Sequence, residues 1–217
     1  MNDKPEAYVT GIAYFYNEEY KVTPDVMIPR PDTERVVDKL TELLPYGGKF
    51  LDLCTGSGCI AVSALRVRKD CTADAVDVSE AALALASENA RINGVDGRLA
   101  FFLADVKSGA ADFTGRGGKY DVIVSNPPYI KTGDIPFLDG SVIDFEPLTA
   151  LDGGNDGLDF YRAITENYTK YVKSGGYIIF EIGYDQAEDI KKTIAGDMRI
   201  SIFRDYGGND RVAVIYV

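Results

Sequence analysis

Short apolar segments alternate with amphipathic segments through the middle of the chain, and this alternation restricts the fold more than any other feature. Runs rich in Val, Ile, Leu and Phe are typical of buried strands, whereas apolar residues three or four positions apart predict helices. Expected strands cover residues 49–53, 73–77, 99–104, 120–125, 177–182, 199–203 and 211–217, with helices between most of them. This order predicts a doubly wound α/β sheet with helices on both faces.

The two ends of the chain complete this prediction. Only the turn residues 205–210 join the last two expected strands, and a connection this short fits a hairpin, because parallel strands need a longer crossover. We therefore expect a mostly parallel, seven-stranded sheet with an antiparallel last strand. Residues 8–29 contain short Tyr-rich runs with turns at Gly11 and Asn17, which predicts an N-terminal hairpin. Residues 1–31 are expected to form a hairpin and linker segment, and residues 32–217 a single domain.

Composition removes several classes of chemistry. The 217 residues include no histidine, which excludes Ser-His and Cys-His nucleophile pairs and imidazole metal ligands. The three cysteines, Cys54, Cys59 and Cys71, lack Cys-x-x-Cys spacing and predict neither a disulfide framework nor a metal site. No apolar run reaches the length of a membrane span and the first residues lack a signal pattern, so we expect a cytoplasmic protein.

The expected strand 120–125 is followed directly by Asn126-Pro127-Pro128-Tyr129. Two consecutive prolines are incompatible with a helix or a strand ladder, so the chain must turn sharply there. The Asn126 carboxamide and the Pro127 carbonyl form a corner rich in hydrogen-bond acceptors, which suits a planar NH2 group, and the Tyr129 ring could stack on that group. The alternative is that the prolines only end the strand and Tyr129 packs over it.

A second set of candidate residues follows three neighbouring strands. Gly56 and Gly58 lie in a turn between a strand and a helix, where glycines let a ligand approach the backbone. Asp77 ends the next strand, 19 residues beyond Gly58, and can accept hydrogen bonds from ribose hydroxyls. The alternative for Asp77 is a cap on the helix expected at 79–93. Asp105 and Val106 follow the third strand and could hold an adenine edge and face, or simply form a turn. Together with Asn126, these residues are expected at the carboxyl edge of the sheet, where such folds bind ligands.

Charge is distributed unevenly along the chain. The net charge is −11, and residues 132–161 carry seven acids without a single Lys or Arg. Because nucleic-acid affinity depends on neutralising phosphates, an acidic rim beside Asn126 disfavours a polynucleotide ligand. The alternative is a solvated loop that its charge keeps soluble.

Five pieces of the sequence resemble the HemK family, the glutamine N5-methyltransferases that modify bacterial peptide-chain release factors. They are Tyr8-x-x-Gly11-x-x-x-Phe15, Ile28-Pro-Arg-Pro-Asp-Thr-Glu34, Asp52-Leu-Cys-Thr-Gly-Ser-Gly-Cys59, Asp77 and Asn126-Pro-Pro-Tyr129. The resemblance implies a class I, Rossmann-like fold and S-adenosylmethionine as the cofactor. It also implies methyl transfer to the glutamine side chain in the Gly-Gly-Gln motif of a release factor. A ribosomal-protein glutamine and a base amino group in RNA or DNA remain alternative acceptors, because Asn-Pro-Pro-aromatic motifs also occur in enzymes that methylate bases.

The resemblance also assigns residues to the two ligands. It implies that Thr55, Gly56, Ser57 and Gly58 line the methionine part of the cofactor, that Asp77 binds its ribose, and that Asp105 and Val106 hold its adenine. Asn126 would touch both cofactor and substrate. The substrate amide would be held by Asn126 and Pro127 and flanked by Phe15 and Tyr129, and Pro128 would also belong to the substrate-binding residues. Arg30, Thr33 and Glu34 would shape the cofactor entrance.

The sequence departs from the family pattern in two places. Cys54 occupies a loop position where methyltransferases usually have glycine, and family members usually carry a helical domain of several dozen residues before the catalytic one. Here about seven residues precede the Tyr8 motif. The surface around residues 8–44 is therefore expected to meet a missing domain or a partner.

Two further classes stay open. A nicotinamide dehydrogenase would share the glycine turn and Asp77, although Ala61 stands where its third glycine is usual. A non-catalytic binding module is the other.

Overall fold

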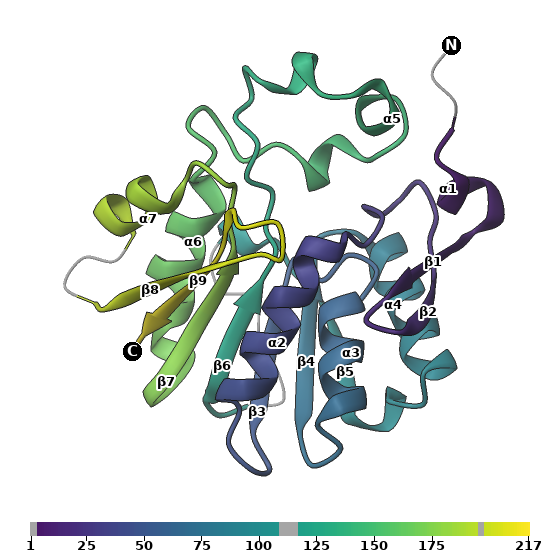
Figure 1. Cartoon of the computed structure of the whole chain (residues 1–217). Helices are drawn as coiled ribbons and strands as arrows, with labels where there is room; N and C mark the ends of the chain where they lie inside the picture. Colours follow the sequence, from purple (N-terminus) through teal and green to yellow (C-terminus); the bar gives the residue numbers. More distant parts are fainter. Residues whose placement is uncertain (1–3, 109–116, 195–197) are drawn as a thin grey trace.

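The computed structural model describes residues 4–108, 117–194 and 198–217, and its centre is a seven-stranded sheet (Figure 1). The strand order is β5-β4-β3-β6-β7-β9-β8. The pairs from β5 to β7 are parallel, and β9 is antiparallel to both β7 and β8, which confirms the predicted sheet. The strands are β3 Lys49–Leu53, β4 Thr72–Asp77, β5 Leu99–Leu103, β6 Tyr120–Ser125, β7 Val172–Glu181, β8 Ile200–Arg204 and β9 Asp210–Tyr216.

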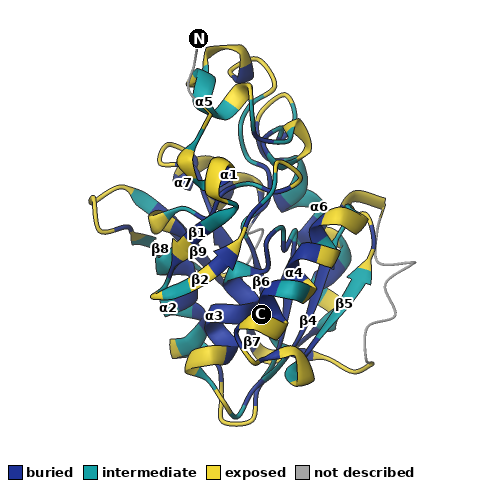
Figure 2. Ribbon diagram, turned by 90° about the vertical axis from the view of Figure 1, so that its right-hand side faces the viewer, coloured by how far each residue is buried: buried dark blue, intermediate teal, exposed yellow. Residues whose placement is uncertain are grey.

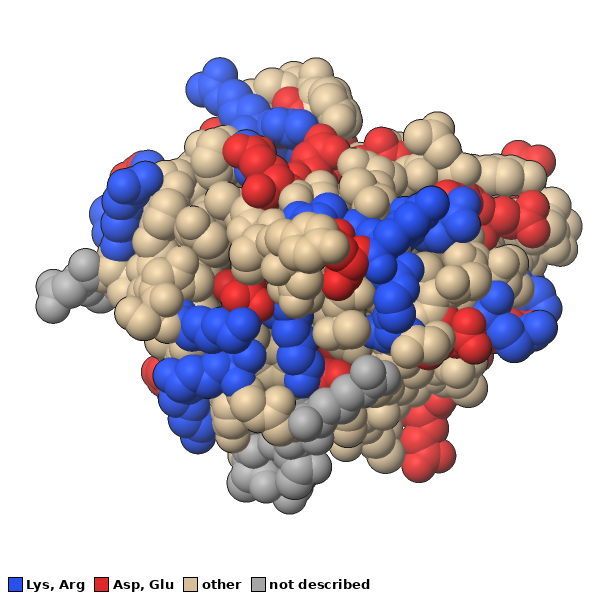
Figure 3. Space-filling model, turned by 90° about the horizontal axis from the view of Figure 1, so that it is seen from below, with Lys and Arg blue, Asp and Glu red and all other residues tan. Residues whose placement is uncertain are grey.

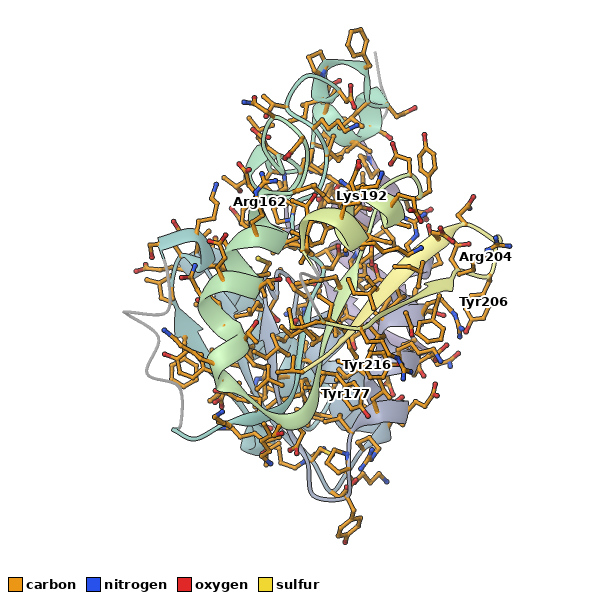
Figure 4. The ribbon with its side chains drawn as sticks, turned by 90° about the vertical axis from the view of Figure 1, so that its left-hand side faces the viewer. Arg162, Tyr177, Lys192, Arg204, Tyr206 and Tyr216 are labelled. Atoms are coloured by element: carbon orange, nitrogen blue, oxygen red, sulfur yellow. The ribbon has the colours of Figure 1, made fainter. Side chains whose placement is uncertain are left out.

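The antiparallel strand β9 lies between β7 and β8. Tyr177 of β7 is opposite Tyr216 of β9, and the two rings meet edge to face with centroids 5.5 Å apart (Figure 4). The short turn after β8 forces the chain to reverse, as the sequence predicts, and Tyr206 in that turn donates a hydrogen bond to Asp38. This end of the sheet is thereby attached to the helix that carries Asp38.

Helices cover both faces of the sheet. Helices α2 Glu34–Leu43, α3 Cys59–Val67 and α4 Glu80–Ile92 pack on one face, and α6 Asp159–Tyr168 and α7 Ala187–Thr193 pack on the other. Successive residues of a strand face opposite sides, so Phe50 joins the first core while Leu51 and Leu53 join the second. Figure 2 shows that buried residues concentrate in the strands between these layers.

The N-terminal segment contains the predicted hairpin, preceded by a short helix. Strands β1 Ile12–Phe15 and β2 Glu18–Lys21 pair antiparallel, and residues 16 and 17 between them both have positive φ angles, as a tight hairpin turn requires. The run at Tyr8 was expected to extend this hairpin, but it forms helix α1 Glu6–Thr10. That helix ends at Gly11, whose φ of 74° is the left-handed conformation that glycine adopts easily. The boundary between residues 31 and 32 stays a prediction.

The acidic segment after β6 stands at one end of the sheet (Figure 1). It includes α5 Gly140–Ile143 and returns beside the Asn-Pro-Pro-Tyr turn, where the Ile130 N–H donates to the Leu151 carbonyl at 3.0 Å. At the other end of the molecule, Figure 3 shows several groups of Lys and Arg side chains.

The short 3-10 helices are η1 Pro31–Thr33, η2 Asp96–Arg98, η3 Val106–Ser108, η4 Ile135–Phe137, η5 Leu148–Ala150 and η6 Thr169–Tyr171. Among the described residues, no helix has the length and apolar composition needed to cross a bilayer.

Candidate active site

A cavity of about 440 Å³ lies at the carboxyl edge of β3, β4, β5 and β6. Its volume is in the range of small-molecule sites, and its position is the one expected for ligands of parallel sheets. The structure brings most of the predicted site residues to its wall. They are Thr55, Gly56, Ser57, Asp77, Asp105, Val106, Asn126 and Pro128.

The loop between β3 and α3 follows a left-handed path. Its positive φ angles are 59° at Cys54, 52° at Gly56 and 80° at Gly58. Cys54 therefore adopts a conformation that costs a side-chain-bearing residue about 1–2 kcal/mol, where glycine would be unstrained. Gly56 lines the cavity and has open space beside it.

Gly58 packs against a neighbouring helix, and its predicted contact with the cofactor stays a prediction. It does not lie on the cavity wall, and a Cβ atom there would be 3.0 Å from the Cβ of Ala86 on α4. This glycine allows helices α3 and α4 to approach each other closely. A Gly-x-Gly pattern does not reveal which glycine faces the ligand and which faces a neighbouring helix.

Asp77 organises the glycine loop from the end of β4. One carboxylate oxygen accepts a hydrogen bond from the Gly56 N–H at 2.8 Å, and the other accepts from the Ser79 N–H at 3.0 Å. The helix cap proposed as an alternative for Asp77 is provided by Ser79, whose hydroxyl accepts from the Ala82 N–H. Burial raises the pKa of Asp77, and the backbone N–H donors oppose that shift.

The cavity suits S-adenosylmethionine by the chemistry of its wall. Asp77 and Asp105 place carboxylate oxygens at the cavity, where they suit the ribose hydroxyls, the amino groups and the cationic sulfur of this cofactor. Each carboxylate can accept more hydrogen bonds than it receives from the protein. Asp105 also accepts from the Lys107 N–H at 2.8 Å, so the turn proposed as its alternative is present as well. Val106 and Ile60 add apolar surface for a base.

Asn126 reaches the cavity from the end of β6 and is connected to a buried acid. Its side-chain nitrogen donates to the Thr33 hydroxyl oxygen at 3.4 Å, and that hydroxyl donates to Glu181 at 2.6 Å. Glu181 is 2% exposed, and burial raises its pKa to about 7, although the Thr33 hydrogen bond and the Arg211 charge oppose this. Sequence reasoning missed Glu181, although an acid in an otherwise apolar strand was a usable signal.

Pro127 and Tyr129 do not line the cavity. Pro127 is buried, and Tyr129 is half-buried, with its hydroxyl 3.4 Å from Glu181 and its carbonyl accepting from Gln186 at 3.0 Å. The packing alternative stated for Tyr129 is thus present in the structure. Contact of these two residues with an amide substrate stays a prediction.

Phe15 is not brought to the site. Its side chain is 2% exposed, its ring meets the Tyr20 ring edge to face at 6.0 Å, and it belongs to the core between the hairpin and the sheet. The expectation that Phe15 flanks a substrate amide is not met by this structure, because β1 points the ring inward.

Of the three residues expected at the cofactor entrance, only Thr33 lines the cavity. Arg30 pairs with the buried Glu146, and Glu34 accepts a hydrogen bond from the Tyr16 N–H at 2.9 Å, so both connect segments of the chain. The sequence does not predict the other parts of the cavity wall, because they come from segments that are distant along the chain and carry no local pattern. They are formed by Val26, Met27, Pro29, residues 147–150 and Phe160.

Comparison with known proteins agrees with this geometry. Residues 32–137 match the family described as "Methyltransferase small domain". With the observed strand order and cavity, this match makes the chain a class I methyltransferase whose cofactor is S-adenosylmethionine.

More specific relatives identify the family. The release factor glutamine methyltransferase of Thermodesulfovibrio yellowstonii is 37% identical in an alignment 221 positions long, which covers 99% of this chain and 77% of that protein. The Streptococcus pneumoniae enzyme of the same name is 40% identical, over 98% of this chain and 75% of that protein. The crystal structure of protein-(glutamine-N5) methyltransferase (release factor-specific) from Alicyclobacillus acidocaldarius gives a TM-score of 0.54 at 29% identity, covering 91% of this chain and 98% of that chain. The chain belongs to the release factor glutamine methyltransferase family.

Proposed function

We propose that this protein transfers a methyl group from S-adenosylmethionine to the side-chain amide nitrogen of a glutamine, in the Gly-Gly-Gln motif of a release factor. The observation that carries the proposal is that Asn126 and Asp77 line the same cavity. A cofactor held by Asp77 and an amide held by Asn126 would then meet without a large movement of the chain. The names of the relatives support a release factor as the acceptor.

The protein's residues divide into a cofactor part and a substrate part. We assign Thr55, Gly56 and Ser57 to the methionine end of the cofactor, Asp77 to the ribose, and Asp105 with Val106 to the adenine. When bound, the cofactor supplies an electrophilic methyl group. Asn126 and the Pro127 carbonyl are the proposed acceptors for the two hydrogens of the substrate amide.

An amide nitrogen is a poor nucleophile, because its lone pair is delocalised, and the chain has no histidine to act as a base. Positioning must therefore supply most of the rate, and for well-oriented reactants it can contribute about 7–11 kcal/mol. Acceptors at Asn126 and Pro127 would also bind more strongly as positive charge grows on the nitrogen, which favours the transition state over the ground state. The released proton can pass to solvent.

Partners beyond the acceptor motif belong to the same proposal. The run without Lys or Arg from residue 132 to 161 disfavours a polynucleotide as the direct substrate. A further domain or partner on the surface of residues 8–44 is part of the same proposal, and Val9 and Tyr14 of that segment are 68% and 76% exposed. Because release factors act in translation, we propose a cytoplasmic location.

Two alanine variants separate the proposed parts. Asn126→Ala should lower kcat by about 100-fold or more, the loss typical of one transition-state hydrogen-bond partner, while cofactor affinity changes little. Asp77→Ala should instead weaken cofactor binding by about 10- to 100-fold, because it removes hydrogen bonds to a charged group. Calorimetric cofactor Kd and steady-state kcat measure both effects. Equal losses of affinity in the two variants, with little extra loss of kcat for Asn126→Ala, would contradict the assignment.

Calorimetry of the wild-type protein also addresses the dehydrogenase alternative. We expect S-adenosylmethionine to bind and NAD to give no heat above its dilution. The reverse result would contradict the proposal before any acceptor is tested.

A further inference from the structure

Glu181 lies behind the cavity wall, at the carboxyl end of β7, and the proposed function gives it no role. Its carboxylate is separated from the cavity by Thr33, which is 1% exposed, and by Asn126. The hydrogen bonds run from Asn126 to Thr33 at 3.4 Å and from Thr33 to Glu181 at 2.6 Å. A buried acid is thus connected through one hydroxyl to the proposed substrate-binding amide.

The direction of these hydrogen bonds decides how the Asn126 carboxamide is oriented. A threonine hydroxyl has a single hydrogen, and Thr33 donates it to the Glu181 carboxylate. The Thr33 oxygen can then only accept, so Asn126 must turn its NH2 group toward Thr33. This leaves the Asn126 side-chain oxygen, an acceptor, for a ligand in the cavity.

Further hydrogen bonds hold the Glu181 carboxylate and its surroundings in place. The Tyr129 hydroxyl approaches its second oxygen at 3.4 Å, and the Tyr161 hydroxyl donates to the Glu181 backbone carbonyl at 2.9 Å. Gln186 in turn donates to the Tyr129 carbonyl at 3.0 Å. Glu181 therefore connects the start of α2 with the turn after β6, on both sides of Asn126.

We propose that Glu181 is a positioning residue, which acts through the Thr33 hydroxyl to keep the oxygen of the Asn126 carboxamide, and not its nitrogen, directed at the substrate. This inference rests on the proposed function and deepens it. An acceptor in that position binds a substrate NH2 group and repels a carboxylate, so the arrangement favours glutamine over glutamate as the acceptor side chain.

The ionisation of Glu181 gives the inference a pH dependence. Thr33 donates its hydrogen to Glu181 only when Glu181 is an ionised carboxylate. Burial raises the pKa of Glu181 to about 7. The wild-type kcat should therefore fall as the pH drops through about 7, and Glu181→Gln should lack this decline. The titratable and charged groups that face Glu181 are Asp32, Cys59, Tyr129, Tyr161 and Arg211.

Four variants test the inference by kinetics. Thr33→Val should lower kcat by about tenfold, the value of one hydrogen bond, and should change the calorimetric Kd of S-adenosylmethionine by much less than that factor. Thr33→Ser restores the hydroxyl and should recover most of the kcat. Glu181→Gln should resemble Thr33→Val, because a glutamine NH2 group can donate to Thr33 and reverse the polarity. Thr41→Val is the matched control, since that hydroxyl donates only within α2, and it should keep wild-type kinetics.

A second measurement does not depend on the acceptor. The side-chain NH2 resonances of Asn126, assigned by their loss in Asn126→Ala, should shift in Thr33→Val and Glu181→Gln but not in Thr41→Val. Unchanged resonances in the first two variants, or wild-type kcat and pH profile in both, would overturn the inference while the proposed function stands. Failure of the wild-type protein to methylate a release factor would instead overturn the proposed function, and the resonances would still decide the role of Glu181.

Discussion

At the scale of single residues, the two glycines of the cofactor loop illustrate how similar sequence positions acquire different roles. Gly56 and Gly58 both have positive φ angles, so a side chain at either position is strained. Only Gly56 lies on the cavity wall, and only Gly58 lies against another helix. The loop therefore needs one glycine for the ligand and one for packing.

Alanine at each glycine should separate these roles. Gly58→Ala should lower the free energy of unfolding by about 2–4 kcal/mol, because overpacking against Ala86 adds to the backbone strain. Gly56→Ala should lower the free energy of unfolding only by the backbone strain, about 1–2 kcal/mol, because no protein atom lies near its added methyl group. It should weaken cofactor binding more than Gly58→Ala does, because Gly56 lines the cavity and the methyl group takes up space there. Urea titration and calorimetry measure the two quantities. Identical effects of the two variants on both would be inconsistent with this division.

The sequence predicts single residues well where the chemistry is local. Asp77, Asp105 and Asn126 each follow a strand directly, and parallel strands bring their carboxyl ends together, so their meeting in one cavity could be predicted. Phe15 could not be placed, because the direction of a hairpin side chain depends on the surface against which the hairpin packs. Glu181 was missed because its contact with Thr33 joins residues 148 positions apart.

At the scale of elements, the N-terminal hairpin is attached to the cofactor loop through helix α4. Asn89 of α4 is fully buried and accepts a hydrogen bond from the Lys21 N–H at 2.8 Å. Its nitrogen donates to the Lys21 carbonyl at 3.0 Å and to the Ser57 carbonyl at 2.9 Å. One carboxamide thus holds both the hairpin and a residue of the cavity wall.

Asn89→Ala should lower both stability and cofactor affinity. Buried backbone groups left without partners cost about 1–3 kcal/mol, and release of Ser57 should loosen the cofactor loop. Asn93→Ala is the matched control, because Asn93 donates to the Glu19 carbonyl of the same hairpin but not to the loop. It should lower the melting temperature without changing the calorimetric Kd. An unaltered Kd for Asn89→Ala would argue against this connection.

The elements themselves were largely predictable, and the exceptions have physical causes. Strands of the sheet are short apolar runs with clear turn signals, so their positions follow from the sequence. Residues around Tyr8 form a helix, although the Tyr-rich run suggested a strand, because the left-handed Gly11 closes a helical turn there. The parts of the cavity wall formed by residues 25–27, Pro29 and residues 147–150 depend on tertiary contacts, which no local sequence pattern predicts.

At the scale of the whole molecule, two buried carboxyl groups make stability depend on pH. Burial raises the pKa of both Asp52 and Glu181 to about 7. A carboxyl group with a raised folded-state pKa binds its proton more tightly when the protein is folded. Its contribution to stability is complete below its unfolded pKa, near 4, and is lost as the pH rises through about 7.

Asp52→Asn should remove one of these contributions. The free energy of unfolding of the wild-type protein should decline relative to that of the variant between about pH 4 and pH 7. Asp156→Asn is the control, because the Arg162 hydrogen bond lowers the pKa of Asp156 to about 2, below this window. Urea unfolding at several pH values gives the comparison. A constant difference between wild type and Asp52→Asn would show that Asp52 titrates elsewhere.

Transfer of a labelled methyl group is the measurement that tests the proposed function most directly. The protein is incubated with methyl-labelled S-adenosylmethionine and, in separate reactions, with a release factor, with the same release factor carrying alanine for the glutamine of its Gly-Gly-Gln motif, and with bulk RNA. We predict label on the unaltered release factor alone. Label on the RNA, or equal label on the altered release factor, would contradict a glutamine side chain as the acceptor.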